Sequence, residues 1–103
     1  MGKGKIGAQC AHAAVGILGR YRGRHEAVFR QWEASGQPKI ALKVKDEEAM
    51  ADLAERAQQC GLMCYIVRDA GRTQIAAGSQ TVLAIGPAPK SRVDQVTGHL
   101  PLM

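Results

Sequence analysis

The sequence predicts an α/β fold, in which α-helices cover both faces of a small mixed β-sheet. Two kinds of apolar spacing predict it: steps of three and four residues in some segments, and steps of two in others. With 103 residues, 46% of them hydrophobic and 22% charged, the chain suits one globular domain with one core. The expected order of elements is α-α-β-α-β-β-α.

The first 45 residues predict two helices and a strand. A first helix, from about residue 5 to 19–23, is expected because apolar residues recur there on one face. They are Ile6, Cys10, Ala13, Ile17 and Tyr21. A second helix over 25–35 ends before Gly36 and Pro38. Residues 39–45 alternate between polar and apolar side chains at the ends of the segment, which predicts a strand near an edge of the sheet whose lysines face water.

The remaining residues predict two more helices and two more strands. Asp46 is placed to cap the first of these helices, and acidic residues follow it where the helix dipole favours them. The expected elements are a helix over 47–59, strands over 62–68 and 80–85, and a helix over 91–97. Between the two strands lie eleven small and polar residues, 69–79, and loops of this length are usually functional.

Charge is distributed unevenly along the chain. Residues 1–45 carry nine basic and two acidic side chains, a net charge of +7, whereas residues 46–103 carry −2. A basic half indicates a polyanionic partner, with nucleic acid first and an anionic membrane surface second. The four aromatic residues are too few for a base-stacking platform. No apolar run is long enough to span a membrane.

The three cysteines, an odd number, favour a reducing compartment over a disulfide framework. Cys60 and Cys64 have a spacing that could suggest a metal site, but no second pair of ligands accompanies them. We therefore expect structural cysteines and no bound metal.

Two clusters of residues could carry chemistry near the N-terminus. Glycines 2 and 4 with Lys3 and Lys5 stand directly before a helix, which is typical of an anion site. The alternative is a frayed, lysine-rich terminus. Lys5, Gln9 and His12 then follow at i, i+4 and i+7, so that they share one stripe beside the apolar face. A structural histidine remains the alternative reading of that stripe.

Asp69 is expected at the end of a strand, and Thr73 follows it in the long loop. Open α/β sheets place their ligands at the carboxyl ends of strands. If the first helix starts at the same end of the sheet, Lys5 and Asp69 face each other. The aspartate could then accept a proton from water while the lysine stabilises an oxyanion. The alternative is an Asp and a Thr that only order the loop by turn hydrogen bonds.

Three segments resemble the signatures of type 2 peptidyl-tRNA hydrolases. Residues 1–14, MGKGKIGAQCAHAA, resemble the opening signature of that family. Residues 69–75, DAGRTQI, with 78–83, GSQTVL, resemble its second signature, and 96–100, VTGHL, resemble its ending. The resemblance covers essentially the whole chain in order.

The resemblance implies hydrolysis of the ester bond between a peptidyl group and the 3′-terminal ribose of tRNA, without metal or cofactor. Lys5, Asp69 and Thr73 correspond to the family's catalytic centre. Asp69 would orient or deprotonate water, Thr73 would position it, and Lys5 would stabilise the oxyanion or grip a phosphate. Substrate-binding positions in the same motifs are Lys3, Gln9, His12, Ser79 and Gln80. The resemblance also implies tRNA as partner, a homodimer, and a cytoplasmic location with mitochondrial association.

Two departures from the family pattern accompany this resemblance. Ala77 stands where the family usually has proline. Relatives also carry one further apolar strand before the opening signature, so we expect a single domain over 1–103 that lacks the family's first strand, with three strands where the family has four. The alternative function is a non-catalytic RNA- or protein-binding module with the same fold.

Overall fold

The structure is a computed structural model that describes residues 2–69 and 78–103. Its elements, in chain order, are α1 (Lys3–Tyr21), the 3₁₀ turn η1 (Arg22–Arg24), α2 (Glu26–Ala34), α3 (Glu47–Gln59), β1 (Cys64–Arg68), β2 (Gln80–Ile85) and α4 (Lys90–Thr97). The predicted α/β class is confirmed, and α3 and β2 have the predicted bounds. Helix α1 begins at Lys3, so Gly4 and Lys5 lie in its first turn and not before the helix as expected.

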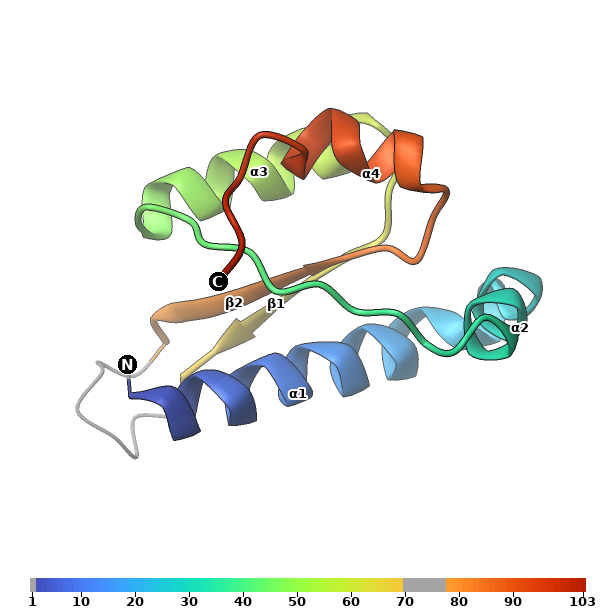
Figure 1. Ribbon diagram of the computed structural model, residues 1–103, viewed down its shortest axis with the longest axis horizontal. Helices are drawn as coiled ribbons and strands as arrows, with labels where there is room; N and C mark the ends of the chain where they lie inside the picture. Colours follow the sequence, from blue (N-terminus) through green and yellow to red (C-terminus); the bar gives the residue numbers. More distant parts are fainter. Residues whose placement is uncertain (1, 70–77) are drawn as a thin grey trace.

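Helices cover both faces of a β-hairpin, as the sequence predicts. Strands β1 and β2 pair antiparallel, with Cys64 opposite Ile85 and an irregularity of register between Val67 and Arg68. Helix α1 packs along one face of both strands, while α3 packs on the other face with α4 beside it (Figure 1). Within the described residues the sheet has two strands and is antiparallel, which corrects the prediction of a mixed sheet with three.

The segment over residues 39–45 is the predicted element that does not form as a strand. It is extended, and within residues 2–69 and 78–103 its one bridge joins Leu42 to Leu102 near the C-terminus (Figure 1). Lys43 N donates to Pro101 O at 2.9 Å, and the amide of Met103 donates to the carbonyl of Ala41 at 3.0 Å. Alternating side chains indicate an extended backbone, but a strand also needs a partner of matching length. Here the C-terminal tail supplies only that short stretch.

The buried side chains lie on both faces of the hairpin and fix the helices to it. On the α3 side the core cluster consists of Leu53, Ala57, Leu62, Cys64 and Val96. Asp46 caps α3 as predicted, since its carboxylate accepts from Ala49 N at 2.8 Å. On the α1 side, a Cβ atom at Gly16 would overlap the ring of Tyr65. The helix therefore lies unusually close to β1, which positions the site described below.

No helix in the described residues is both long and apolar enough to cross a membrane.

An ion pair joins η1 to α2 and gives a testable dependence on pH. The guanidinium of Arg22 donates to both carboxylate oxygens of Glu33, at 2.9 and 2.6 Å. This hydrogen bonding holds the pKa of Glu33 below its usual value. Because the pKa is lower in the folded chain than in the unfolded chain, the pair stabilises the fold above the ordinary carboxyl pKa. That contribution is lost as pH falls through the lowered pKa.

We expect Arg22→Gln to return the pKa of Glu33 toward its ordinary value, as measured by an NMR titration of the Glu33 carboxyl carbon. Arg24→Gln is the matched control, because Arg24 is exposed and is not among the groups that shift Glu33. An unchanged Glu33 titration in the Arg22 variant would contradict the assignment.

Candidate active site

The centre of the candidate site is an ion pair between Lys5 and Asp69. Lys5 lies in the first turn of α1, and Asp69 directly follows β1. The start of α1 and the end of β1 lie at the same end of the hairpin (Figure 1). Lys5 Nζ is 3.0 Å from Asp69 Oδ1, and the side chains are 19% and 5% exposed. The expectation that these two residues face each other is confirmed.

The backbone of Asp69 is held by the start of the second strand. Its amide donates to Ser79 O at 2.8 Å, and its carbonyl accepts from Gly78 N at 2.9 Å. These two hydrogen bonds hold the backbone of Asp69, and with it the carboxylate, against the start of β2. Ser79 thus contributes to the site through its backbone carbonyl.

Gln9 lies one helical turn after Lys5 and ties α1 to the sheet. It is buried, and its amide nitrogen donates to Thr81 Oγ1 at 3.1 Å. The hydroxyl of Thr81 in turn donates to Val67 O at 3.3 Å. These bonds link the helix to both strands beside the ion pair. They fix the distance between Lys5 and Asp69.

The remaining predicted site residues are Lys3, His12, Gln80 and Thr73. His12 and Lys3 are exposed on α1. Gln80 donates its amide to Glu47 Oε1 at 3.2 Å, while its own side-chain oxygen is buried and has no hydrogen-bond partner within residues 2–69 and 78–103. Thr73 lies outside the described residues, so the structure does not place it.

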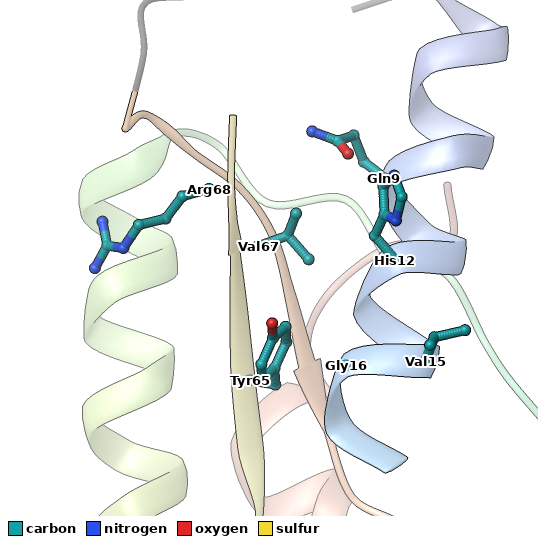
Figure 2. Close-up of a pocket in the computed structure, with 7 residues that line it drawn as sticks. All are labelled: Gln9, His12, Val15, Gly16, Tyr65, Val67 and Arg68. Carbon is teal, nitrogen blue, oxygen red and sulfur yellow. The ribbon is translucent and has the colours of Figure 1, made fainter. Parts of the chain in front are cut away.

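A groove of about 430 Å³ runs between α1 and β1 (Figure 2). Its lining consists of Gln9, His12, Val15, Gly16, Tyr65, Val67 and Arg68. Val67 and Tyr65 point toward α1, whereas the guanidinium of Arg68 points away from the groove (Figure 2). Gln9 and Arg68 at one end are the neighbours of Lys5 and Asp69. The groove therefore leads to the ion pair.

Two residues of this site, Thr81 and Tyr65, are not among the sequence-based candidates. A signal exists for each of them. Thr81 is the one polar side chain in the otherwise apolar run 81–85. Tyr65 precedes Asp69 by four residues, so the two side chains lie on the same face of an extended segment. Neither signal distinguishes a site residue from an ordinary strand residue.

The arrangement can carry acid–base chemistry. An ammonium group lies in contact with a carboxylate that is nearly removed from solvent. The carboxylate can accept a proton from water, and the ammonium can stabilise negative charge that develops nearby. Within the part of the chain that the structure describes, no three His, Cys, Asp or Glu residues are grouped so that they could hold a metal ion.

Comparison with known proteins decides the family. The family model described as "Peptidyl-tRNA hydrolase PTH2" matches residues 1–103. The chain belongs to the PTH2 family. This agrees with the resemblance of its three motifs and with the position of two of them at the Lys5–Asp69 pair.

Several curated PTH2 relatives are similar over nearly the whole chain. "Peptidyl-tRNA hydrolase 2, mitochondrial" of Homo sapiens is 52% identical over 102 residues, which are 99% of this chain and 57% of the human protein. "Probable peptidyl-tRNA hydrolase 2" of Drosophila melanogaster is 48% identical over 103 residues, covering 100% of this chain and 55% of the fly protein. "Peptidyl-tRNA hydrolase" of Halobacterium salinarum is 44% identical over 102 residues, covering 99% and 88%. The chain thus spans little more than half of the human and fly proteins.

Proposed function

We propose that the chain hydrolyses the ester bond between a peptidyl group and the 3′-terminal ribose of tRNA, which returns the tRNA to translation. We also propose that residues 1–103 form one PTH2 domain. The contact of 3.0 Å between Lys5 and Asp69 carries the proposal, because it joins the two signature motifs into one reactive centre. The names of the relatives, peptidyl-tRNA hydrolases, support it.

In the proposed reaction, the carboxylate of Asp69 accepts a proton from a water molecule as the water oxygen attacks the ester carbonyl carbon. The electron pair of the carbonyl moves onto its oxygen, where the ammonium of Lys5 stabilises the negative charge. Collapse of this intermediate breaks the bond to the ribose oxygen, which takes the proton back from Asp69. The family motif assigns Thr73, outside the described residues, to position the water.

The proposed substrate-binding residues lie in the same two motifs as the ion pair. The exposed side chains of Lys3 and His12 on α1 can reach phosphate or ribose groups. The buried oxygen of Gln80 has no partner in the described residues, and an unsatisfied buried acceptor is costly. Gln80 follows Ser79 in the same motif, at the start of β2. Ser79 and Gln9 would act by holding Asp69 and α1 in place.

Charge on α1 and η1 supports tRNA as the substrate. Helix α1 has 19 residues and is therefore roughly 28 Å long. Lys3 stands at its start, and Arg20 and Arg24 lie at its end and beyond it; all three are exposed. Cations spread over this length suit the phosphates of a folded RNA rather than its bases.

We expect the double variant Arg20→Gln and Arg24→Gln to weaken tRNA binding and to flatten its dependence on salt. Each lost phosphate contact lowers the slope of log affinity against log salt by about 0.7–0.9. Lys90→Gln is the control, because Lys90 is exposed on α4, on the opposite side of the hairpin. Binding is measured by fluorescence anisotropy between about 50 and 200 mM salt. Equal slopes for the parent, the double variant and the Lys90 variant would contradict electrostatic binding of tRNA phosphates by Arg20 and Arg24.

The function is tested by incubating the purified chain with N-acetyl-aminoacyl-tRNA and measuring release of the N-acetyl amino acid, alongside tRNA binding. Release with multiple turnovers supports the hydrolase. Binding without any release would instead support the non-catalytic RNA-binding module.

We further propose a reducing location, the cytoplasm, with association to mitochondria. The cysteines support a reducing compartment, since Cys10, Cys60 and Cys64 are all free in the structure. The human relative carries "mitochondrial" in its name. Fractionation of cells that express the tagged chain tests the proposal, and recovery from the secretory pathway would contradict it.

A further inference from the structure

Strand β1 has an edge that pairs with no other strand among the described residues. Gly86 N donates to Met63 O at 2.9 Å, and in an antiparallel pair the bonded residues alternate along each strand. Backbone groups at 63, 65 and 67 therefore face β2, and those at 64, 66 and 68 face the open edge. Cys64 agrees, because its carbonyl accepts from the hydroxyl of Tyr21 at 3.0 Å instead of from β2.

This open edge leads directly to the ion pair. Ile66 and Arg68 turn their amide and carbonyl groups outward, and Asp69 follows them. Within residues 2–69 and 78–103, neither backbone group of Ile66 has a partner on this edge. The groove between α1 and β1 runs along the same strand, past Tyr65 and Val67 (Figure 2).

We propose that the peptidyl group of the substrate binds as an added strand along the open edge of β1, with its esterified end at the Lys5–Asp69 pair. This inference rests on the proposed function. Peptides released with tRNA differ in sequence but share one backbone, and strand addition recognises that backbone. An exposed strand edge beside an ester-cleaving centre therefore fits this part of the substrate.

The position of Asp69 fixes the direction of the bound peptide. The ester lies at the carboxyl end of β1, so the peptide runs parallel to the strand. In a parallel pair, the amide of Ile66 donates to one peptide carbonyl, and its carbonyl accepts from the amide two residues nearer the ester. The backbone of Arg68 provides the next such pair of bonds. Every second amide of the peptide is therefore bonded.

The groove receives the side chains on one side of this added strand. Successive side chains of a strand point to opposite faces, so every second one faces α1. The groove there presents an imidazole from His12, the apolar side chain of Val67, which points toward α1 (Figure 2), and the phenol of Tyr65. This mixed lining can accept polar, apolar and aromatic side chains. It suits an enzyme that does not select one peptide sequence.

The first experiment varies the length of the peptide on one tRNA, from N-acetyl-alanyl-tRNA to N-acetyl-pentaalanyl-tRNA. We expect kcat/KM to rise roughly three- to tenfold with each added bonded amide and to level off once the five-residue strand is matched. A second series methylates one peptide nitrogen at a time. Because only every second amide is bonded, we expect kcat/KM to fall at alternate positions and to stay the same at the positions between them.

A protein variant tests the same edge without changing the substrate. Ile66→Pro removes the outward amide, and proline is tolerated on open strand edges. We expect the ratio of kcat/KM for the long and short substrates to fall toward one, whereas Ile66→Val keeps the parent ratio. Thermal melting shows whether each variant is folded, and the methylated substrates decide the question if the proline variant is not.

The outcomes separate this inference from the proposed function. Failure to hydrolyse even the shortest substrate would overturn both. Hydrolysis at equal rates for all lengths, or equal effects of methylation at neighbouring positions, would overturn strand addition alone. If Tyr65→Leu lowered kcat/KM equally for every peptide length, the groove would hold the RNA end instead, and the inference would be wrong.

Discussion

Asp69→Asn is expected to lower kcat for hydrolysis of N-acetyl-aminoacyl-tRNA by about 10²–10⁴-fold, the usual contribution of a general base. The amide has nearly the shape of the carboxylate and can still accept a hydrogen bond from Lys5, but it cannot take a proton from water. Binding of tRNA should change little, because Asp69 is buried and carries no positive charge. The measurement is a single-turnover rate at saturating enzyme, with anisotropy for affinity.

The control for this variant is Asp94→Asn. Asp94 forms an ion pair with Lys90 on α4, but its side chain is 45% exposed and lies on the opposite side of the hairpin. We expect this variant to keep the parent rate. If Asp69→Asn hydrolyses the substrate as fast as the parent while remaining folded, Asp69 is not the base.

Lys5→Met is expected to reduce both the rate and the stability. The methionine stem fills the space of the lysine but removes the ammonium that lies 3.0 Å from the Asp69 carboxylate. Loss of the charged partner from a carboxylate as buried as that of Asp69 costs about 3–5 kcal/mol. Loss of an oxyanion stabiliser lowers kcat by about 10²–10³-fold. Urea denaturation and single-turnover kinetics measure the two effects separately.

Lys5→Arg distinguishes a structural role of Lys5 from a catalytic one. Arginine keeps the positive charge but carries it on a broad planar group, so the reacting oxygen would meet it in a different position. We expect stability close to that of the parent with kcat still reduced. Full recovery of kcat would mean that Lys5 supplies only charge, and a loss of stability equal to that of Lys5→Met would contradict the pairing.

Local signals made several elements predictable. The bounds of α3 follow from Asp46, whose side chain caps its first turn, and from Gly61, whose φ of +73° ends it. The segment over residues 39–45 is predicted as a strand and does not form one, and this failure could not be foreseen from local signals. Its sequence specifies an extended backbone, but its hydrogen bonds depend on residues near 101–103, more than fifty positions away. Pairing over such distances has no local signal.

The candidate site was predictable where helix periodicity reached it. Spacing along α1 put Lys5 and Gln9 on one stripe, and the end of β1 put Asp69 opposite. The burial of Gln9 was not predictable, because it depends on Thr81 as an acceptor across the sheet. A glutamine beside an apolar face looks like a boundary residue until its partner on the other element is known.

The most direct test of the Lys5–Asp69 pair as a single reactive centre is a double-mutant cycle on kcat. It compares Lys5→Met, Asp69→Asn and the double variant, with Lys90→Met and Asp94→Asn as the matched exposed pair. If the two residues act as a unit, the double variant should be no slower than the slower single variant, within about twofold. If the reduction of kcat in the double variant equals the product of the reductions in the two single variants, Lys5 and Asp69 act independently and the proposed centre is wrong.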